Sequence, residues 1–155
     1  MSIDTDKLYA FIVKAKANSY VGRAPKCLPS RLDSHDVQYQ EDDFAYLDSY
    51  FGGTDFLGQE VVYFRNEAVW AMNYYGRIIA PDIYDGEKAG NVVLASLSKH
   101  YQTGHFLGNS NNDTEWGRYI DTNEGDVSRF TGYEWIEFDS RKVYELHYHG
   151  GLIKP

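Results

Sequence analysis

The feature that most constrains the fold is a stretch of sequence that occurs twice. Residues 56–76 and 130–150 align without a gap, and seven of the 21 paired positions are identical. Random matching at average composition would give roughly one or two identities. Upstream, residues 46–49 (Tyr-Leu-Asp-Ser) are similar to residues 119–122 (Tyr-Ile-Asp-Thr). The chain is therefore expected to fold as two similar halves.

The composition is that of one globular domain. Hydrophobic residues make up 43% and charged residues 25% of the 155 residues, which are ordinary values for a folded chain. We therefore expect a single domain of residues 1–155, with pseudo-repeats at about residues 5–80 and 88–155. The 14 Tyr, 8 Phe and 3 Trp favour a sheet, because aromatic residues fit a pleated, half-buried surface.

Charge and cysteine content exclude several kinds of partner. The net charge is −8 and the basic residues are scattered, whereas binding to nucleic acid or to an anionic membrane needs clustered positive charge. No apolar run is long enough to span a bilayer and no signal peptide is evident, so we expect a cytoplasmic protein. The single cysteine, Cys27, rules out an internal disulfide and a cysteine metal cluster. No phosphate-binding glycine loop or nucleophile elbow occurs, so no cofactor is expected, and the oligomeric state stays open.

The first half is expected to contain one helix followed by antiparallel strands. Apolar residues recur at helical spacing through residues 7–18, and the lysines of this segment, Lys16 among them, are expected on the opposite face. Residues 20–35 contain glycine and prolines and are expected to be irregular. Strands are then expected at residues 37–39, 44–47, 58–64 and 68–76.

The second half is expected to repeat this order. Residues 80–90 are expected to be a linker, a second helix begins near Asn91, and residues 108–113 form a mobile polar loop. Further strands are expected at residues 119–122, 133–138 and 142–149. We predict an α+β fold: one antiparallel sheet built from two pseudo-repeats, each a helix plus three or more strands, with the helices packed on one face.

Two glutamates are expected to point into the core. Glu60 and Glu134 occupy matching positions of the two halves and share a strand face with apolar residues. A buried carboxylate must be paired, hydrogen-bonded or protonated. A structural role tied to a neighbouring Arg, Tyr or backbone amide is favoured, because the residue occurs in both halves. An acid/base or cation-binding role is the alternative.

Two histidines occur where the halves differ. Asn73 and Tyr75 of the first half are replaced by His147 and His149 in the second. Both histidines share a strand face with Glu145, and such a group would suit a divalent metal only if a further ligand such as His105 joined it. Ordinary surface or packing histidines are the favoured interpretation, and no metal site is predicted.

Other candidate residues come from loops and strand ends. Arg31 lies in the irregular segment, which would either be a solvated loop or an arm that brings Arg31 to a carboxylate or ligand. The candidate ligand-binding residues are therefore Arg31, Asp48, Ser49, Glu60, Tyr74, Tyr75, Glu134, His147 and His149.

Several motifs resemble an uncharacterised prokaryotic domain family of unknown function. They include Pro29-Ser30-Arg31, Tyr46-Leu47-Asp48-Ser49-Tyr50, Trp70-Ala71-Met72-Asn73-Tyr74-Tyr75-Gly76 and His149-Gly150-Gly151. The resemblance covers nearly the whole chain. It implies a bacterial or archaeal protein, and it implies a regulatory role in those members that follow a helix-turn-helix module. The present sequence differs in lacking that module before its first helix and in residues 105–108.

Three classes of function are consistent with these residues. The favoured one is a non-catalytic small-molecule-sensing or interaction domain, with an aromatic-lined cleft where the two halves meet. The second is a small hydrolase or isomerase that uses Glu60 and Glu134, or His147 and His149, as acid/base groups or metal ligands. The third is a protein-interaction module, which would show a flat exposed apolar patch.

Overall fold

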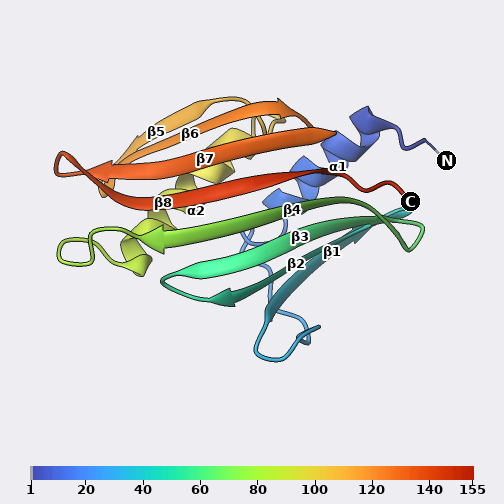
Figure 1. The fold of residues 1–155 in the computed structure, drawn as a ribbon, viewed down its shortest axis with the longest axis horizontal. Coiled ribbons are helices and arrows are strands. Elements are labelled where there is room, and N and C mark those ends of the chain that lie inside the picture. Colours follow the sequence, from blue (N-terminus) through green and yellow to red (C-terminus); the bar gives the residue numbers. More distant parts are fainter. Residues whose placement is uncertain (1) are drawn as a thin grey trace.

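The computed structural model describes residues 2–155 and contains two helices and eight strands (Figure 1). The first helix and four strands are α1 (Thr5–Ala17), β1 (His35–Glu41), β2 (Phe44–Gly52), β3 (Phe56–Phe64) and β4 (Glu67–Ile78). The second helix and four strands are α2 (Gly86–Tyr101), β5 (Ser110–Thr114), β6 (Gly117–Asp126), β7 (Arg129–Phe138) and β8 (Arg141–Leu152). The expected α+β class with an antiparallel sheet is confirmed.

All eight strands form one sheet in the order β1-β2-β3-β4-β8-β7-β6-β5. Strands β1 to β4 make one antiparallel meander and β5 to β8 make another. The two meanders join at the centre, where β4 pairs with β8 and Tyr74 lies opposite Tyr148. Within each meander, neighbouring antiparallel strands need only tight turns to connect them. Because β4 pairs with β8, the last strand of each meander is central in the sheet and the first strand lies at an edge.

The two meanders have the same internal register. Phe56 pairs with Gly76 and Phe130 pairs with Gly150, each across the last hairpin of its meander. Each of these hairpins also contains a register shift near its turn, after Val62 in one and after Ile136 in the other. The turns themselves have positive φ at two successive residues, at 65–66 and 139–140, as a type I′ turn requires.

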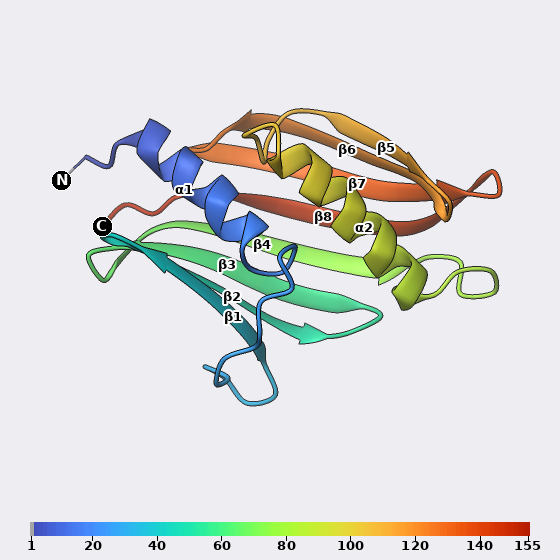
Figure 2. The same cartoon turned by 180° about the vertical axis from the view of Figure 1, so that it is seen from behind.

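Both helices lie on the same face of the sheet (Figure 2). The N-cap carboxylate of Asp4 accepts hydrogen bonds from backbone amides of the first turn of α1, and Asp85 does the same for α2. The core fills the space between these helices and the sheet, with Leu8, Ile12, Val62 and Trp70 completely or almost completely buried.

Three expectations about local structure were wrong. Helix α2 begins at Gly86 rather than near Asn91, because the Asp85 carboxylate caps it within the expected linker. Residues 110–114 form the edge strand β5 instead of a loop, since their backbone pairs with β6 although their side chains are polar. Lys16 does not lie on the solvent face of α1 but is 7% exposed.

No helix within residues 2–155 is long and apolar enough to cross a membrane.

Candidate ligand-binding cavity

A cavity of about 430 Å³ lies between the helices and the helix-covered face of the sheet. Side chains from both meanders and from both helices line it, so it crosses the central pair of strands. Most of its wall is apolar or aromatic. A cavity of this size and character fits a small organic molecule.

Four buried carboxyl groups line the cavity, two from each meander. Their residues are only 4–6% exposed, and they are Asp48, Glu60, Asp121 and Glu134. Asp48 pairs directly with Glu60 across β2 and β3, and Asp121 pairs with Glu134 across β6 and β7. Residues directly opposite each other in an antiparallel pair have their side chains on the same face. The cavity therefore contains two adjacent acidic pairs.

Each aspartate accepts a hydrogen bond from a tyrosine two strands away. The Tyr74 hydroxyl donates to Asp48 over 2.6 Å, and the Tyr148 hydroxyl donates to Asp121 over 2.7 Å. The intervening strand carries a glycine opposite each tyrosine, Gly58 and Gly132. A β-carbon on either glycine would overlap the tyrosine side chain. These glycines therefore leave the space through which each tyrosine reaches its aspartate.

The glutamates accept hydrogen bonds from other tyrosines. The Tyr46 hydroxyl donates to Glu60, and the Tyr119 hydroxyl donates to Glu134. Glu134 accepts a second hydrogen bond, of 3.0 Å, from Tyr144. Hydrogen bonds from neutral hydroxyls satisfy buried carboxyl oxygens without neutralising their charge.

Lys16 is the one buried cation within the described residues of the cavity wall. Its Nζ lies 2.6 Å from Oε2 and 2.9 Å from Oε1 of Glu60. It also lies 5.4 Å from the centre of the Phe106 ring, a distance at which a cation is attracted to an aromatic face. The acidic pair in the first meander thus has a counter-ion, whereas Asp121 and Glu134 have none within hydrogen-bonding distance.

Burial and mutual repulsion favour the protonated form of these carboxyl groups. Burial raises the pKa of Asp48 to about 7, with a further contribution from the charge of Glu60. Burial likewise raises the pKa of Glu134 to about 7, helped by the charge of Asp121. The pKa of Asp121 rises to about 6 through burial, although the hydrogen bond from Tyr148 opposes the change. Three cavity carboxyl groups therefore titrate near neutral pH.

Some polar atoms that face the cavity have no protein partner. Within residues 2–155, Oδ2 of Asp48 accepts no hydrogen bond, whereas the Asp121 carboxylate accepts them from Tyr148 and from the Asn123 side chain. The hydroxyl of Tyr101, which lines the cavity from α2, donates to no acceptor in the same part of the chain. Burial and the charges of Glu60 and Glu134 raise the pKa of this tyrosine, so the hydroxyl keeps its proton. These atoms are available to a ligand.

The loop after α1 and the strand β1 contribute the remaining charged groups of the wall. The Lys26 Nζ lies 3.0 Å from Nδ1 of His35, and both residues are partly or fully exposed. Lys26 also lies 5.9 Å from the centre of the Tyr50 ring. These two side chains occupy the accessible part of the cavity wall, whereas Lys16 and the carboxyl groups are buried.

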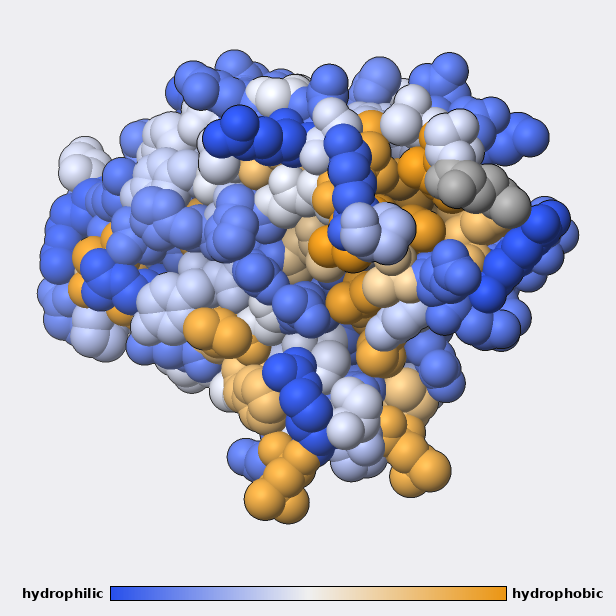
Figure 3. Space-filling model, turned by 45° about the vertical axis from the view of Figure 1, so that its right-hand side comes forward, coloured by the Kyte–Doolittle hydropathy of each residue, from blue (hydrophilic) through white to orange (hydrophobic). Residues whose placement is uncertain are grey.

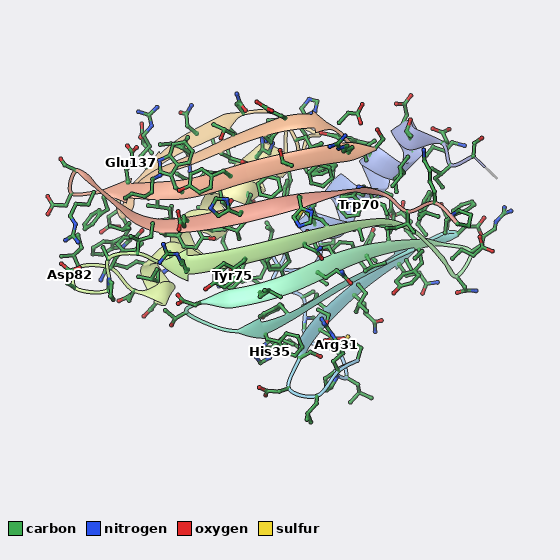
Figure 4. All side chains as sticks on the ribbon, viewed as in Figure 1. Arg31, His35, Trp70, Tyr75, Asp82 and Glu137 are labelled. Atoms are coloured by element: carbon green, nitrogen blue, oxygen red, sulfur yellow. The ribbon has the colours of Figure 1, made fainter. Side chains whose placement is uncertain are left out.

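Four of the nine candidate residues line the cavity. They are Asp48, Glu60, Tyr74 and Glu134. The other five lie elsewhere, and Figure 4 shows two of them, Arg31 in the loop beside β1 and Tyr75 on β4, well apart from each other. Strand alternation places Ser49 and Tyr75 on the face of the sheet opposite to Asp48 and Tyr74. The sequence therefore identified part of the cavity but also residues that belong to the other face.

Arg31 and Ser49 take part in a separate polar cluster on that other face. The guanidinium of Arg31 donates to the Ser49 hydroxyl over 3.0 Å, and Ser49 donates to Asp36 over 2.9 Å. Asp36 also accepts hydrogen bonds from the Ser30 amide and the Ser34 hydroxyl. Burial alone would raise the pKa of Asp36, but these hydrogen bonds lower it to about 2. The cluster ties the loop before β1 to the sheet.

The two candidate histidines of β8, His147 and His149, do not line the cavity. His147 and His149 are exposed on the face of β8 opposite to Tyr148, and the His147 ring packs 4.5 Å from Tyr133. His105 packs against Tyr9 instead of joining them. Among residues 2–155, no group of three or more His, Cys, Asp or Glu side chains has an arrangement that could hold a metal ion.

Sequence reasoning missed three principal residues of the cavity, Lys16, Asp121 and Tyr148. The duplication carried a signal for two of them, because Asp121 matches Asp48 and Tyr148 matches Tyr74 in the alignment of the halves. Lys16 follows the buried Ile12 by four residues, which places it on the same face of α1. The sequence pattern predicted the opposite face for Lys16 because its side chain is charged.

Comparison with protein-family models matches residues 48–153 to a domain of unknown function, DUF5680. The matched range begins at Asp48 and includes all four carboxyl residues of the cavity. No curated protein and no solved structure matches the chain significantly.

Proposed function

The chain belongs to the DUF5680 family, and we propose that it serves as a non-catalytic small-molecule-binding domain. The observation that carries the proposal is the cavity of about 430 Å³, which has mostly apolar and aromatic walls and four carboxyl groups facing it. An open cavity of this size, with a few polar groups in an apolar wall, is typical of a small-molecule site.

The residues at the cavity support binding more than catalysis by the histidines. Within residues 2–155 the cavity wall includes no arginine, and His147 and His149 lie on the other face of the sheet. His35 is the histidine of the wall, and it pairs with Lys26 rather than with a carboxyl group. An acid/base pair of histidine and carboxylate is thus not formed among these side chains.

Catalysis by a carboxyl group is the second candidate function. Glu134 lines the cavity, and burial raises its pKa to about 7, a value suited to general acid/base chemistry at neutral pH. This candidate predicts turnover of a bound molecule that is lost in Glu134→Gln although binding remains. The binding proposal predicts that a bound molecule is recovered unchanged from the wild-type protein.

We also infer that the domain arose by internal duplication, with pseudo-repeats at about residues 5–80 and 88–155. The identical registers, the matching turns and the two Tyr–Asp pairs support this inference. The helices of both halves lie on one face, so the cavity forms where the two halves meet (Figure 2). Ligand sites commonly form at such junctions.

The proposal includes a cytoplasmic setting, and the sequence resemblance implies a bacterial or archaeal protein. The alternative to a small-molecule ligand is a protein partner, which would bind an exposed apolar surface. Leu28 and Leu32 are 90% and 96% exposed in the loop before β1, in the region where hydrophobic side chains project at the bottom of Figure 3. An interaction module would have no deep cavity, and this chain has one of about 430 Å³, so the cavity is the stronger candidate.

Native mass spectrometry of the untagged protein tests the proposal. We expect a mass above that of the denatured chain, from a co-purified small molecule, or such a mass after incubation with a fragment library. Gly90→Leu should abolish the added mass, because Gly90 lines the cavity and a β-carbon there meets no atom within 4 Å. Ala95→Leu, on the exposed face of the same helix, is the matched control.

Two results would contradict the proposal. The first is a bare mass for the wild-type protein under both conditions. The second is an added mass that Gly90→Leu retains, which would place the bound molecule outside the cavity.

A further inference from the structure

We propose that the ligand of the cavity is a small organic cation, whose ammonium group lies beside Asp121 and Glu134 as the Lys16 ammonium lies beside Glu60. This inference rests on the proposed binding function and specifies its ligand class. It requires that the cavity contain more negative than positive charge, that it have space beside the second acidic pair, and that unpaired acceptors face that space.

The charged groups that face the cavity are strongly unbalanced. Lys16 from α1 is the buried cation, whereas β2, β3, β6 and β7 each supply one carboxyl group. The four carboxyl groups are Asp48, Glu60, Asp121 and Glu134. Lys26 and His35 are more exposed and interact with each other. Buried charges are normally paired, so full ionisation of the carboxyl groups needs positive charge from outside the chain.

The helix that covers the second meander supplies no cation to the cavity. Lys16 of α1 contacts Glu60. The residues that α2 directs to the cavity are instead small, apolar or hydroxyl-bearing, namely Gly86, Ala89, Gly90, Val93, Leu97 and Tyr101. The second acidic pair, Asp121 and Glu134, thus lies under a helix that leaves space and brings no charge. A ligand ammonium group would occupy the position that a lysine fills in the other half.

The free acceptors lie on the same side. The Asp121 carboxylate accepts hydrogen bonds from Tyr148, over 2.7 Å, and from the Asn123 side chain, which leaves other lone pairs of its two oxygens free. The Tyr101 hydroxyl donates to no acceptor within residues 2–155, and the charges of Glu60, Glu134 and Asp121 all help to raise its pKa. A protonated amine donates up to three hydrogen bonds, as the lysine side chain does, and could bridge such acceptors.

Aromatic walls favour the same class of ligand. Tyr148, Tyr101 and Phe106 line the cavity close to the acidic pair or to Lys16. Aromatic faces attract cations, and the attraction strengthens where water is excluded. An anionic ligand of equal size would meet the buried carboxyl groups and gain nothing from the rings.

Binding of a cation is coupled to proton release. In the free protein at pH 6, Asp48 and Glu134 are largely protonated, because burial raises the pKa of each to about 7. A nearby ammonium group favours the ionised carboxylate and lowers its pKa again. Binding therefore expels protons below pH 7, and affinity for the cation should rise between pH 6 and pH 8.

Isothermal titration calorimetry with two sets of matched probes tests the inference. The aromatic set is 2-phenylethylamine, 2-phenylethanol and phenylacetate, and the aliphatic set is hexylamine, hexanol and hexanoate. We expect the amine of at least one set to bind at least tenfold more tightly than its own alcohol and acid. Its apparent enthalpy at pH 6.5 should differ between phosphate and Tris buffers, as proton release requires.

Charge-neutralising variants locate the ammonium group. Asp121→Asn and Glu134→Gln should each weaken amine binding roughly ten- to hundred-fold, the loss typical of a charge-assisted hydrogen bond, and should leave alcohol binding unchanged. Glu137→Gln removes a charge from the opposite, exposed face of β7 and is the matched control. Circular dichroism spectra that match the wild type confirm that each variant is folded.

The outcomes separate this inference from the proposed function. If an alcohol or acid binds as tightly as its amine, the cavity is a ligand site but the cation inference is wrong. If amine binding survives Asp121→Asn and Glu134→Gln unchanged, the assigned position is wrong. If no probe of either set binds and native mass spectrometry also finds no ligand, both the inference and the proposed function fail.

Discussion

The ammonium group of Lys16 lies 2.6 Å from the carboxylate of Glu60, and both side chains are about nine-tenths buried. A second ion pair of the same helix has nearly the same length: Nζ of Lys14 lies 2.7 Å from Oε1 of Glu41. The side chains of this pair, however, are 54% and 39% exposed. Two ion pairs of α1 with the same chemistry thus differ mainly in burial. This difference makes them a matched experiment.

Lys16→Met should destabilise the fold by about 3–5 kcal/mol, because removing one partner leaves a buried charge without compensation. Lys14→Met should leave the unfolding midpoint essentially unchanged, since water screens the exposed pair. Urea unfolding followed by circular dichroism measures both. The double variant Lys16→Met/Glu60→Met should recover most of the loss, and a Lys16→Met protein as stable as the wild type would contradict the buried ion pair.

Gly132→Ala should strongly destabilise the protein, because a β-carbon at that position would overlap the ring of Tyr148 and force it away from Asp121. Gly90→Ala is the control, since its β-carbon meets no atom within 4 Å and alanine favours the helix by about 1 kcal/mol. Thermal unfolding should therefore show a lower midpoint for Gly132→Ala and a higher one for Gly90→Ala. Equal shifts in one direction would show that the glycines do not have these different roles.

Stability should fall as pH rises from about 4 to about 7. The pKa of Asp48 and that of Glu134 are raised by burial to about 7, and that of Asp121 to about 6, so the folded state binds more protons than the unfolded state in this range. The stabilisation is complete below the unfolded pKa and is lost as pH passes through the folded value, at about 1.4 kcal/mol per unit of pKa difference.

Urea unfolding at a series of pH values measures this slope. Asp48→Asn and Glu134→Gln should each flatten it, whereas Glu137→Gln on the exposed face should not. A wild-type stability that rises between pH 5 and pH 7 would contradict the raised pKa values.

Asp36→Ala should release the loop that precedes β1. The Asp36 carboxylate accepts hydrogen bonds from the Ser30 amide at 2.9 Å, from Ser34 at 2.7 Å and from Ser49 at 2.9 Å, so its loss removes three hydrogen bonds that hold the loop on the sheet. Limited trypsin digestion should then cleave after Arg31 at least several-fold faster than in the wild type. Gln38→Ala, an exposed change on the same strand, should have the wild-type rate.

The sheet was largely predictable because alternation and duplication both act over many residues. Strand β4 shows why: Trp70, Met72 and Tyr74 occupy alternate positions, pack in the core under the helices and are less exposed than the residues between them, as the pattern predicted. Strand β5 was missed because its residues Ser110–Thr114 are all polar, although its backbone pairs with β6 and its Asp113 lies 3.8 Å from Arg118 of β6. Such a strand has no hydrophobic signal.

The site was only partly predictable because burial of charge depends on partners that are distant in sequence. The inward direction of Glu60 and Glu134 followed from alternation. The counter-ion Lys16 lies 44 positions from Glu60 and belongs to a helix whose lysines resemble solvent-facing ones. Tyr75 and His149 looked suitable as ligands by residue type, but alternation places both on the face away from the cavity.

The sheet is open at both ends: β5 pairs only with β6, and the outer side of β1 has just a single bridge, from Cys27 to Asp36. Exposed strand edges can recruit the edges of other molecules and begin aggregation. The β5 edge is short and entirely polar, and α2 contacts it through Asn112, whose amide donates to Ser96 and whose carbonyl oxygen accepts from Lys99. The polar residues of β5 therefore oppose edge-to-edge association, which an edge built like β4 would promote.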